Sequence, residues 1–307
     1  MKPVYLSSYE TEVLDERLER LYKILESCEL CPRKCRVNRM RGERGYCKSG
    51  MEIMVSSFNP HFGEEDPLVG TGGSGTIFLT NCNLLCVYCQ NYEISHLGYG
   101  SAVREDKVAE YMISLQRRGC HNINFVTPTH YTPQLVKAIK LAIPKGLNLP
   151  IVWNCGGYEN VETIKLLEGI VDIYMPDIKY GRSDTAKEYS NAPDYFERCK
   201  EAVREMHRQV GDLVIENGIA KKGLLIRHLV LPEDGAGSEE VLRFIAEEIS
   251  KNTYINIMDQ YRPMYKAYKY DGLKRRPTFE EYGRVVKLAR KFGLERGESF
   301  RHPLGLI

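Results

Sequence analysis

The sequence has no long hydrophobic run, no strict internal repeat and no low-complexity tract. No stretch approaches the roughly eighteen apolar residues that are needed to cross a membrane. The first residues also lack the apolar segment of a signal peptide, so we expect a soluble, cytoplasmic protein. The chain lacks a strong charge imbalance too, with a net charge of +2 over 307 residues. A uniformly basic nucleic-acid-binding protein is therefore not indicated.

Hydrophobic residues make up 43% of the chain, which is enough for a sizeable core in one or two domains. Residues 10–27 have the apolar periodicity of an amphipathic helix. Residues 28–75 are rich in Cys, Arg, Gly and Pro and show little periodicity. We therefore predict an amino-terminal helix and metal-binding extension over 1–75, followed by a larger domain over 76–307.

From residue 76 onward, short apolar segments alternate with helical patterns. The predicted strands are 75–80, 122–127, 149–155, 171–179, 224–232 and 253–261. The predicted helices are 104–118, 132–143, 160–168, 184–209, 238–250 and 278–291. Repeated strand–helix units predict an α/β fold with a parallel sheet, either a partial barrel or an open doubly wound sheet.

Polar residues gather where each predicted strand ends. They are Asn81–Cys82, Thr127–His130, Asn154–Tyr158, Asp177–Lys179, Pro232–Glu233 and Gln260–Arg262. In parallel α/β folds, functional sites form at the carboxyl ends of the strands. We therefore expect these six strand ends to surround one pocket.

Seven of the ten cysteines fall into two clusters, and clustered cysteines in a cytoplasmic chain indicate metal binding. The central cluster is Cys82-Asn-Leu-Leu-Cys86-Val-Tyr-Cys89. It has neither the C-x2-C pairs of a closed zinc site nor the nearby fourth Cys of a bacterial ferredoxin. A four-iron cluster held by three thiolates leaves one iron open for reaction. The alternative is a zinc site completed by His96 or His121, but the place of the loop after the first strand favours catalysis.

The Cys-x3-Cys-x2-Cys spacing, with aromatic Tyr88 before the last Cys, resembles the radical S-adenosylmethionine enzymes. Residues 81–91 look like the branch similar to pyruvate formate-lyase activating enzymes, and the resemblance covers roughly residues 76–262. It implies a partial (β/α)6 TIM-like barrel with the cluster in the loop after the first strand. It also implies that the open iron chelates S-adenosylmethionine, and that one electron from a flavodoxin or ferredoxin-like reductant cleaves the carbon–sulfur bond. The 5′-deoxyadenosyl radical then takes a hydrogen atom from a substrate.

The resemblance further implies cofactor-binding residues at the strand ends. Asp177 and Lys179 match an Asp-x-Lys element, in which the carboxylate binds the ammonium and ribose side and the lysine binds the carboxylate. Arg227 matches an Arg-x-x-x-x-Pro element, and Arg262 offers a guanidinium fork for an anion. Simple ion pairs or solvated side chains are the alternatives for these four residues.

The ends of the second and third strands depart from the family pattern. Many relatives carry Gly-Gly-Glu-Pro after the second strand, where this chain has Thr127, Thr129 and His130 as candidates for binding the amino group. Asn154 is the candidate at the third strand, where two glycines permit close approach of the backbone to a ligand. An ordinary turn is the alternative at both places.

The amino-terminal cluster Cys28-x2-Cys31-x3-Cys35-x11-Cys47 supplies four thiols, which suit either zinc or a second iron–sulfur cluster. A structural metal that folds this segment is favoured over electron transfer. Residues 31–48 also contain seven Lys or Arg and one Glu. Such charge would suit RNA, but a solvated face is the simpler interpretation and nucleic acid is not an expected partner.

Three hypotheses about function follow from these patterns. The first is a radical enzyme that acts on a protein, for example by forming a glycyl radical. The second is radical modification of a small molecule or an RNA base. The third is a metal-stapled nucleic-acid-binding protein without turnover, which the three-thiol motif disfavours because binding needs no open iron.

Overall fold

A parallel sheet of six strands forms the centre of the computed structural model, which describes residues 1–300. The strands follow one another in the order β2 (Ser74–Leu79), β4 (Ile123–Val126), β5 (Ile151–Cys155), β6 (Ile173–Pro176), β8 (Ile219–Leu229) and β9 (Tyr254–Met258). Among residues 1–300, β9 pairs with β8 but not with β2, so the sheet is not closed. Leu79 of β2 and Met258 of β9 nevertheless line one cavity, so the sheet curves into an open barrel. The predicted α/β fold with a parallel sheet is confirmed.

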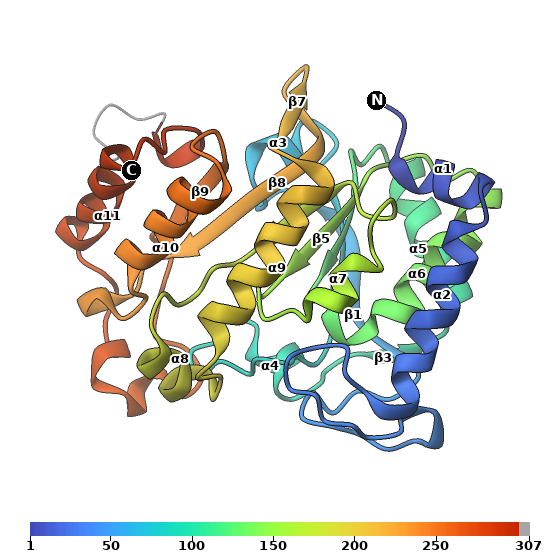
Figure 1. Ribbon diagram of the computed structural model, residues 1–307, viewed down its shortest axis with the longest axis horizontal. Helices are drawn as coiled ribbons and strands as arrows, with labels where there is room; N and C mark the ends of the chain where they lie inside the picture. The colour runs from blue at the N-terminus through green and yellow to red at the C-terminus, as the bar shows by residue number, and fades with distance from the viewer. Residues whose placement is uncertain (301–307) are drawn as a thin grey trace.

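Helices cover the outer face of this sheet (Figure 1). They are α5 (Glu105–Arg117), α6 (Thr132–Ala142), α7 (Val161–Lys165), α8 (Ser183–Ser190), α9 (Tyr195–Val210), α10 (Ser238–Phe244) and α11 (Phe279–Lys291). Successive strand residues point to opposite faces. Phe125 and Trp153 are therefore buried in the outer core, while Val152 and Met175 belong to a separate inner core. Burying each such side chain contributes about 1.5–3 kcal/mol.

Three strands were not predicted from the sequence: β1 (Ile53–His61), β3 (Ser101–Val103) and β7 (Val214–Glu216). β1 runs antiparallel between β2 and β3, and β7 forms a hairpin with β8. Only the first part of β1 is apolar, because serines, Asn59 and Pro60 follow Val55. An outer strand tolerates such residues, including proline, so its sequence lacks the usual strand signal. Residues 53–61, which lie within the predicted extension, thus belong to the central sheet.

The connection from β1 to β2, residues 62–73, closes the amino end of the barrel and is called the plug below. It contains the short helix α3 (Asp66–Val69). Leu68 of this helix is fully buried and packs with inner core residues such as Val152 and Leu225. Because the amino end is filled, the space available for a site lies at the carboxyl ends of the strands.

The amino-terminal region packs along the side of the barrel. The helix predicted over 10–27 is present as α2 (Val13–Ile24) with a 3-10 turn (Leu25–Ser27) after it, and α2 lies beside α6 (Figure 1). A further short helix, α1 (Val4–Glu10), precedes it and was not predicted. The Tyr5 hydroxyl donates a 2.9 Å hydrogen bond to the Leu149 carbonyl, and Val4 N–H donates to the Asp172 carboxylate at 2.8 Å. No helix within residues 1–300 is long and apolar enough to cross a membrane.

Residues 28–50, called the knuckle below, form a compact loop segment with one short 3-10 helix (Arg39–Arg41). The knuckle lies at the carboxyl end of the barrel, near α4 (Tyr92–Ser95) (Figure 1). The division of the chain into an extension and a barrel domain stays a prediction.

Candidate functional site

One cavity of about 270 Å³ lies where the parallel strands end. Many of the predicted site residues line it together: Cys82, Cys86, Cys89, Thr127, Asn154, Asp177, Lys179 and Arg227. Leu79, Val126, Leu229 and Met258 supply apolar wall, and Gln90 and Gln260 supply polar groups. The strand ends therefore surround one pocket as expected, except that Arg227 and Leu229 represent β8 instead of Pro232–Glu233.

The loop that carries the three central cysteines follows β2 and turns sharply. Asn81 and Leu85 adopt φ values of +69° and +53°, a conformation that non-glycine residues hold only when their surroundings require it. Each of the three sulfurs accepts a hydrogen bond. Ser190 Oγ donates to Cys86 Sγ at 3.0 Å and Ser95 Oγ donates to Cys89 Sγ at 3.2 Å, while the Leu84 N–H lies 3.3 Å from Cys82 Sγ. Such bonds favour the thiolate form that binds a metal.

Without a metal, burial of the thiols favours their protonated form over the thiolate. It raises the pKa of Cys82 to about 12, and it also raises the pKa of Cys89, with the neighbouring Cys86 adding to both shifts. A metal centre supplies the positive charge that would allow these thiols to lose their protons. The donor set, three sulfurs beside open space, fits a cluster with one open position.

The alternative zinc site, completed by His96 or His121, is not supported. His96 Nε2 lies 3.0 Å from the Cys86 carbonyl oxygen, and His121 Nε2 accepts a 3.0 Å hydrogen bond from the Gly72 N–H. Both imidazoles thus bond main-chain atoms. Within residues 1–300, no group of three or more cysteine, histidine or acidic side chains has the geometry to hold a single metal ion.

Asp177 lies at the centre of an ion network beside the thiols. Arg227 Nε donates to Asp177 Oδ1 at 2.7 Å, and Lys179 Nζ donates to Asp177 Oδ2 at 2.6 Å. Burial alone would raise the pKa of Asp177, but these two cations outweigh burial and lower it. Burial would likewise lower the pKa of Lys179, which the Asp177 carboxylate instead raises. Both side chains are therefore charged at neutral pH.

Arg227 is surrounded by acceptors of the protein itself. Besides Asp177, it donates through Nη2 to Asn154 Oδ1 at 2.7 Å. Its Nη1 lies 3.5 Å from Glu64 Oε2 and 3.9 Å from Glu65 Oε1, both from the plug. These contacts are the ion pairs that the sequence left open as the alternative for Arg227, and its part in cofactor binding stays a prediction. The guanidinium fixes Asp177 and Asn154, which reach the cavity wall.

The structure does not bring Thr129, His130 or Arg262 to this cavity. Thr127, with a φ of +60°, turns the chain away at the end of β4. Thr129 Oγ1 then donates to the buried Glu159 carboxylate at 2.6 Å, and His130 Nε2 bonds the Thr80 carbonyl at 2.8 Å. Arg262 is exposed, whereas the nearby Gln260 lines the cavity. The sequence placed these residues correctly at strand ends but could not show which way the turns lead.

The four knuckle cysteines, Cys28, Cys31, Cys35 and Cys47, line a second, small cavity as free thiols. Arg39 and His130 complete its wall, and Arg39 Nε and His130 Nδ1 are buried without a hydrogen-bond partner. The Tyr46 N–H lies 3.3 Å from Cys35 Sγ, and Gly45 is so close that an added Cβ would lie 2.8 Å from this sulfur. Four thiols around one cavity are the donor set of a structural zinc or of an iron–sulfur cluster, but in their present positions they do not have the geometry to hold a single metal ion.

Arg33 of the knuckle binds the loop that carries Cys82, Cys86 and Cys89, which is called the catalytic loop below for its proposed role, and the sequence did not reveal this link. Its Nε donates to the Asn83 carbonyl at 2.9 Å and its Nη2 to the Ser190 carbonyl at 2.8 Å, while Nη1 reaches the Asn191 carbonyl. The guanidinium carbon lies 3.9 Å from the ring centre of Tyr46. Arg33 thereby joins the knuckle to the segments that carry and contact Cys82 and Cys86.

Comparison with known proteins agrees with this geometry. Residues 76–245, more than half of the chain, match the family model of the radical SAM superfamily. The uncharacterized protein MJ0674 of Methanocaldococcus jannaschii is 33% identical over 290 residues, covering 92% of this chain and 80% of the relative. The uncharacterized protein MJ0808 of the same organism is 24% identical over 292 residues, covering 89% and 79%.

A solved structure shares the fold. A radical SAM methyltransferase from Sphaerobacter thermophilus superposes with a TM-score of 0.50 at 14% sequence identity. The match covers 73% of this chain and 65% of the methyltransferase. At this identity the likeness concerns the fold alone.

Proposed function

The chain belongs to the radical SAM superfamily, and from this premise we propose that Cys82, Cys86 and Cys89 hold a 4Fe–4S cluster in an enzyme that reductively cleaves S-adenosylmethionine. Membership of the family implies both the cluster and S-adenosylmethionine. When bound together, the cluster and S-adenosylmethionine would supply the radical that abstracts hydrogen from a substrate. The observation that carries the assignment to these residues is that the three thiols share one cavity with Asp177 and Lys179.

Residues around the thiols suit the polar parts of the cofactor. The Lys179 ammonium, held in place by Asp177, presents a positive charge to the cavity and would bind the carboxylate of S-adenosylmethionine. Asp177 and Asn154 offer acceptors for its ammonium and ribose hydroxyls, and Arg227 fixes both acceptors. Gly156 permits the close packing of the loop, because an added Cβ would lie 2.9 Å from Leu84 Cδ1. The apolar wall would exclude water from the reactive centre.

For the substrate, we propose a glycine of a protein, as in the glycyl-radical activating enzymes. This finer assignment is supported by the resemblance of residues 81–91 and by the Asp177–Lys179 pair. Gln90 and Gln260 lie together at the cavity, where Gln90 Nε2 donates to the Gln260 carbonyl at 3.1 Å. Amide side chains of this kind can pair with the peptide groups of an extended segment.

For the knuckle, we propose zinc or a second iron–sulfur cluster at Cys28, Cys31, Cys35 and Cys47. Burial raises the pKa values of Cys28 and Cys31, so a metal is needed for their thiolates to persist. The knuckle has few apolar residues of its own, and a metal would supply the stability that a core does not.

The test is anaerobic reconstitution with iron and sulfide, reduction with dithionite and addition of S-adenosylmethionine. The wild-type protein should release 5′-deoxyadenosine, and the cofactor should perturb the spectrum of the cluster. Cys86→Ala should lose both signals, whereas Cys120→Ala is the matched control, since Cys120 is buried but belongs to neither cluster. Wild-type protein with neither signal would contradict an enzyme of this class.

Two further measurements separate the finer assignments. Metal analysis of Cys86→Ala should show that the central cluster is lost while the knuckle metal remains, and loss of both together would show that the two sites are not independent. Incubation with a candidate protein substrate should give a carbon-centred doublet in electron paramagnetic resonance. Release of 5′-deoxyadenosine with a small molecule or RNA, and no such doublet with proteins, would favour the second hypothesis.

A further inference from the structure

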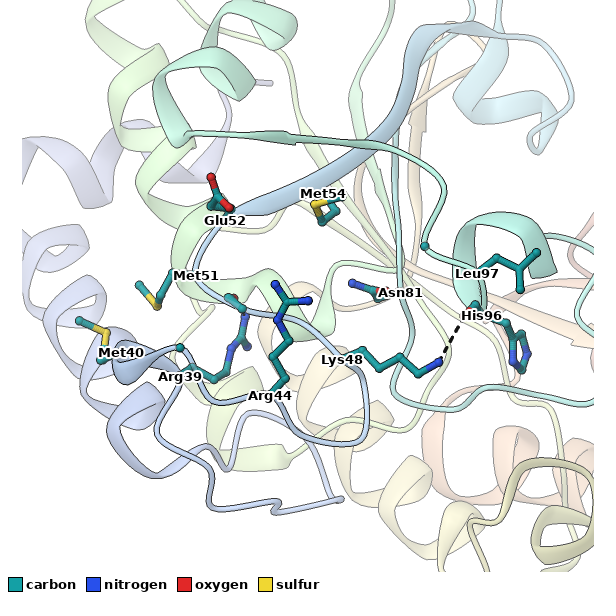
Figure 2. A pocket seen from close by; sticks show the side chains of 13 residues that line it. Arg39, Met40, Arg44, Lys48, Met51, Glu52, Met54, Asn81, His96 and Leu97 are labelled. Carbon is teal, nitrogen blue, oxygen red and sulfur yellow. Dashed lines mark hydrogen bonds between the residues drawn. The ribbon is translucent and has the colours of Figure 1, made fainter.

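A cavity of about 540 Å³ lies between the knuckle and the back of the catalytic loop (Figure 2). Its walls come from two sides. Arg39, Met40, Arg44 and Lys48 belong to the knuckle, whereas Asn81, His96 and Leu97 flank the three central cysteines in the sequence. This cavity is separate from the one that contains Cys82, Cys86 and Cys89.

Positive charge surrounds this cavity. Figure 2 shows Arg44 and Lys48 between the knuckle loop and the segment of His96. Both are exposed. Lys266, also exposed, is close by, because its Nζ lies 5.1 Å from the ring centre of Tyr265, and that ring centre lies 4.4 Å from the ring centre of His96. Among residues 1–300, these three cations form no ion pair, unlike Lys34 and Arg36, which pair with Glu29. Within the part of the chain that the structure describes, Glu52 is the one acidic residue that lines this cavity, against the basic residues Arg39, Arg44 and Lys48, so the net charge of the wall is positive.

Exposed apolar side chains occupy the same face. Met40 is 52% exposed and Leu97 is 49% exposed, and both line the cavity; Tyr99, two residues further, is 61% exposed. Figure 2 shows Met40 and Leu97 on opposite sides of the cavity, with Arg44 and Lys48 between them. Exposed methionine, aromatic and arginine side chains on one surface are typical of protein interfaces, where these residues are enriched. A flexible methionine adapts to a partner surface.

This face is connected to the catalytic thiols by short contacts. Lys48 Nζ lies 3.5 Å from the His96 carbonyl oxygen, and His96 Nε2 lies 3.0 Å from the Cys86 carbonyl oxygen. Asn81 in the cavity wall directly precedes Cys82. A protein bound here would stand next to the cluster without entering the cavity for the cofactor.

We propose that this basic face docks the acidic one-electron donor protein, a ferredoxin or flavodoxin, that reduces the catalytic cluster. This docking face rests on the proposed function, and it adds the surface at which the donor would reduce the cluster. One electron leaves the reduced donor, which becomes oxidised by one electron, and the cluster is reduced by one electron; no bond is made or broken. Complementary charge speeds such encounters and makes their rates fall with ionic strength.

The test compares two reductants of the reconstituted enzyme. Reduced ferredoxin with an acidic surface is the protein probe, and dithionite is the small-molecule reductant. In wild-type protein, ferredoxin should reduce the cluster at a rate that falls as salt is added. The double variant Arg44→Glu/Lys48→Glu should be reduced by ferredoxin at least about tenfold more slowly. Release of 5′-deoxyadenosine driven by dithionite should be the same in both proteins.

A second variant and a control make the result decisive. Lys48 follows the knuckle ligand Cys47, so metal content is measured, and Lys266→Glu tests the same face without changing the knuckle. Arg118→Glu/Lys145→Glu is the control, since both residues are exposed at the carboxyl ends of outer helical segments, at the opposite end of the barrel. This control should be reduced at the wild-type rate.

Equal ferredoxin rates in wild-type protein and in both basic-face variants would overturn the proposal. So would an RNA that binds wild-type protein, fails to bind the double variant and leaves the ferredoxin rates equal, because the face would then bind nucleic acid. If dithionite also gives no 5′-deoxyadenosine in wild-type protein, the proposed function fails, which is a result distinct from failure of the docking face.

Discussion

The guanidinium of Arg33 donates a 2.8 Å hydrogen bond to the main-chain carbonyl of Ser190. The Ser190 hydroxyl in turn donates to Cys86 Sγ at 3.0 Å. A side chain between two knuckle cysteines therefore fixes the residue that bonds a central cysteine. The two sets of thiols are separate in the sequence, and Arg33 is one of the residues that connect them in the structure.

Replacing this arginine should weaken both the fold and the catalytic loop. Arg33→Lys keeps the charge, but an ammonium cannot reproduce the planar fork that reaches Asn83, Ser190 and Asn191. We expect the free energy of unfolding to fall by about 2 kcal/mol and the iron content of the central site to fall with it. Thermal unfolding and iron analysis measure these changes. The matched control is Arg36→Lys, which alters an exposed pair with Glu29 and should cost less than about 0.5 kcal/mol. We call these three hydrogen bonds of Arg33 the Arg33 clamp. Equal losses of unfolding free energy in the two variants would show that the clamp does not stabilise the protein.

Gly157 packs directly against the main chain of Asp177, and an added side chain there should disrupt the site. Its φ is +76°, and a Cβ would lie 2.2 Å from the Asp177 carbonyl oxygen and 2.8 Å from the Tyr195 hydroxyl. We expect Gly157→Ala to destabilise the protein by about 4 kcal/mol or more, as shown by its thermal midpoint. Gly146→Ala is the control for backbone strain alone, since Gly146 has a φ of +92° with open space around it, and it should cost about 1 kcal/mol. Similar midpoints for both variants would show that the close contact is unimportant.

The buried Glu159 should make stability depend on pH. Burial raises its pKa from 4.5 to about 7, against the hydrogen bond from Thr129. The folded state thus holds a proton that the unfolded state has already released between these two values, so stability falls as pH rises through that range. The loss is on the order of 3 kcal/mol at most. Glu159→Gln should abolish this part of the pH dependence of thermal unfolding, whereas exposed Glu197→Gln should not. Parallel curves for wild-type protein and Glu159→Gln would rule out this source.

Substitutions of Arg227 and Arg262 should differ sharply in their effect on binding of S-adenosylmethionine, although the sequence makes both residues equally plausible candidates for that role. Arg227→Lys loses the fork that holds Asp177 and Asn154 together, so binding of S-adenosylmethionine should weaken about tenfold or more. Arg262 is exposed and outside the cavity, and Arg262→Lys should bind as wild type does. Titration of the cluster spectrum with S-adenosylmethionine measures both. A larger effect at Arg262 would contradict the structure of the site.

The strand–helix alternation allowed the barrel and most of the cavity to be predicted. Parallel strands place their carboxyl ends together, so Cys82, Asn154 and Asp177 could be assigned to one pocket from local patterns alone. β1 escaped prediction because an outer strand does not need a continuous apolar pattern, and Pro60 in its pairing region masks it further.

Other parts of the site depend on contacts that no local pattern encodes. Ser190 reaches Cys86 from a helix 104 positions away, and Glu64 reaches Arg227 through the plug. His130 lies after the strand end as predicted but lines the knuckle cavity instead of the central one, because the chain turns away at Thr127, whose φ is positive. Periodicity predicts which residues share a face, but not the direction of the turn after a strand.

The Arg33 clamp also has a consequence for biosynthesis. Its partner Ser190 lies about 160 residues later in the chain, and at roughly 5–20 residues per second the ribosome needs about 8–30 seconds to make that stretch. The four knuckle thiols therefore emerge well before the surface that will hold them exists. During that interval the thiols are exposed on the nascent chain, where they can be oxidised or can bind the wrong metal. Loading of the knuckle before the barrel closes would make metal delivery an early step in the maturation of this enzyme.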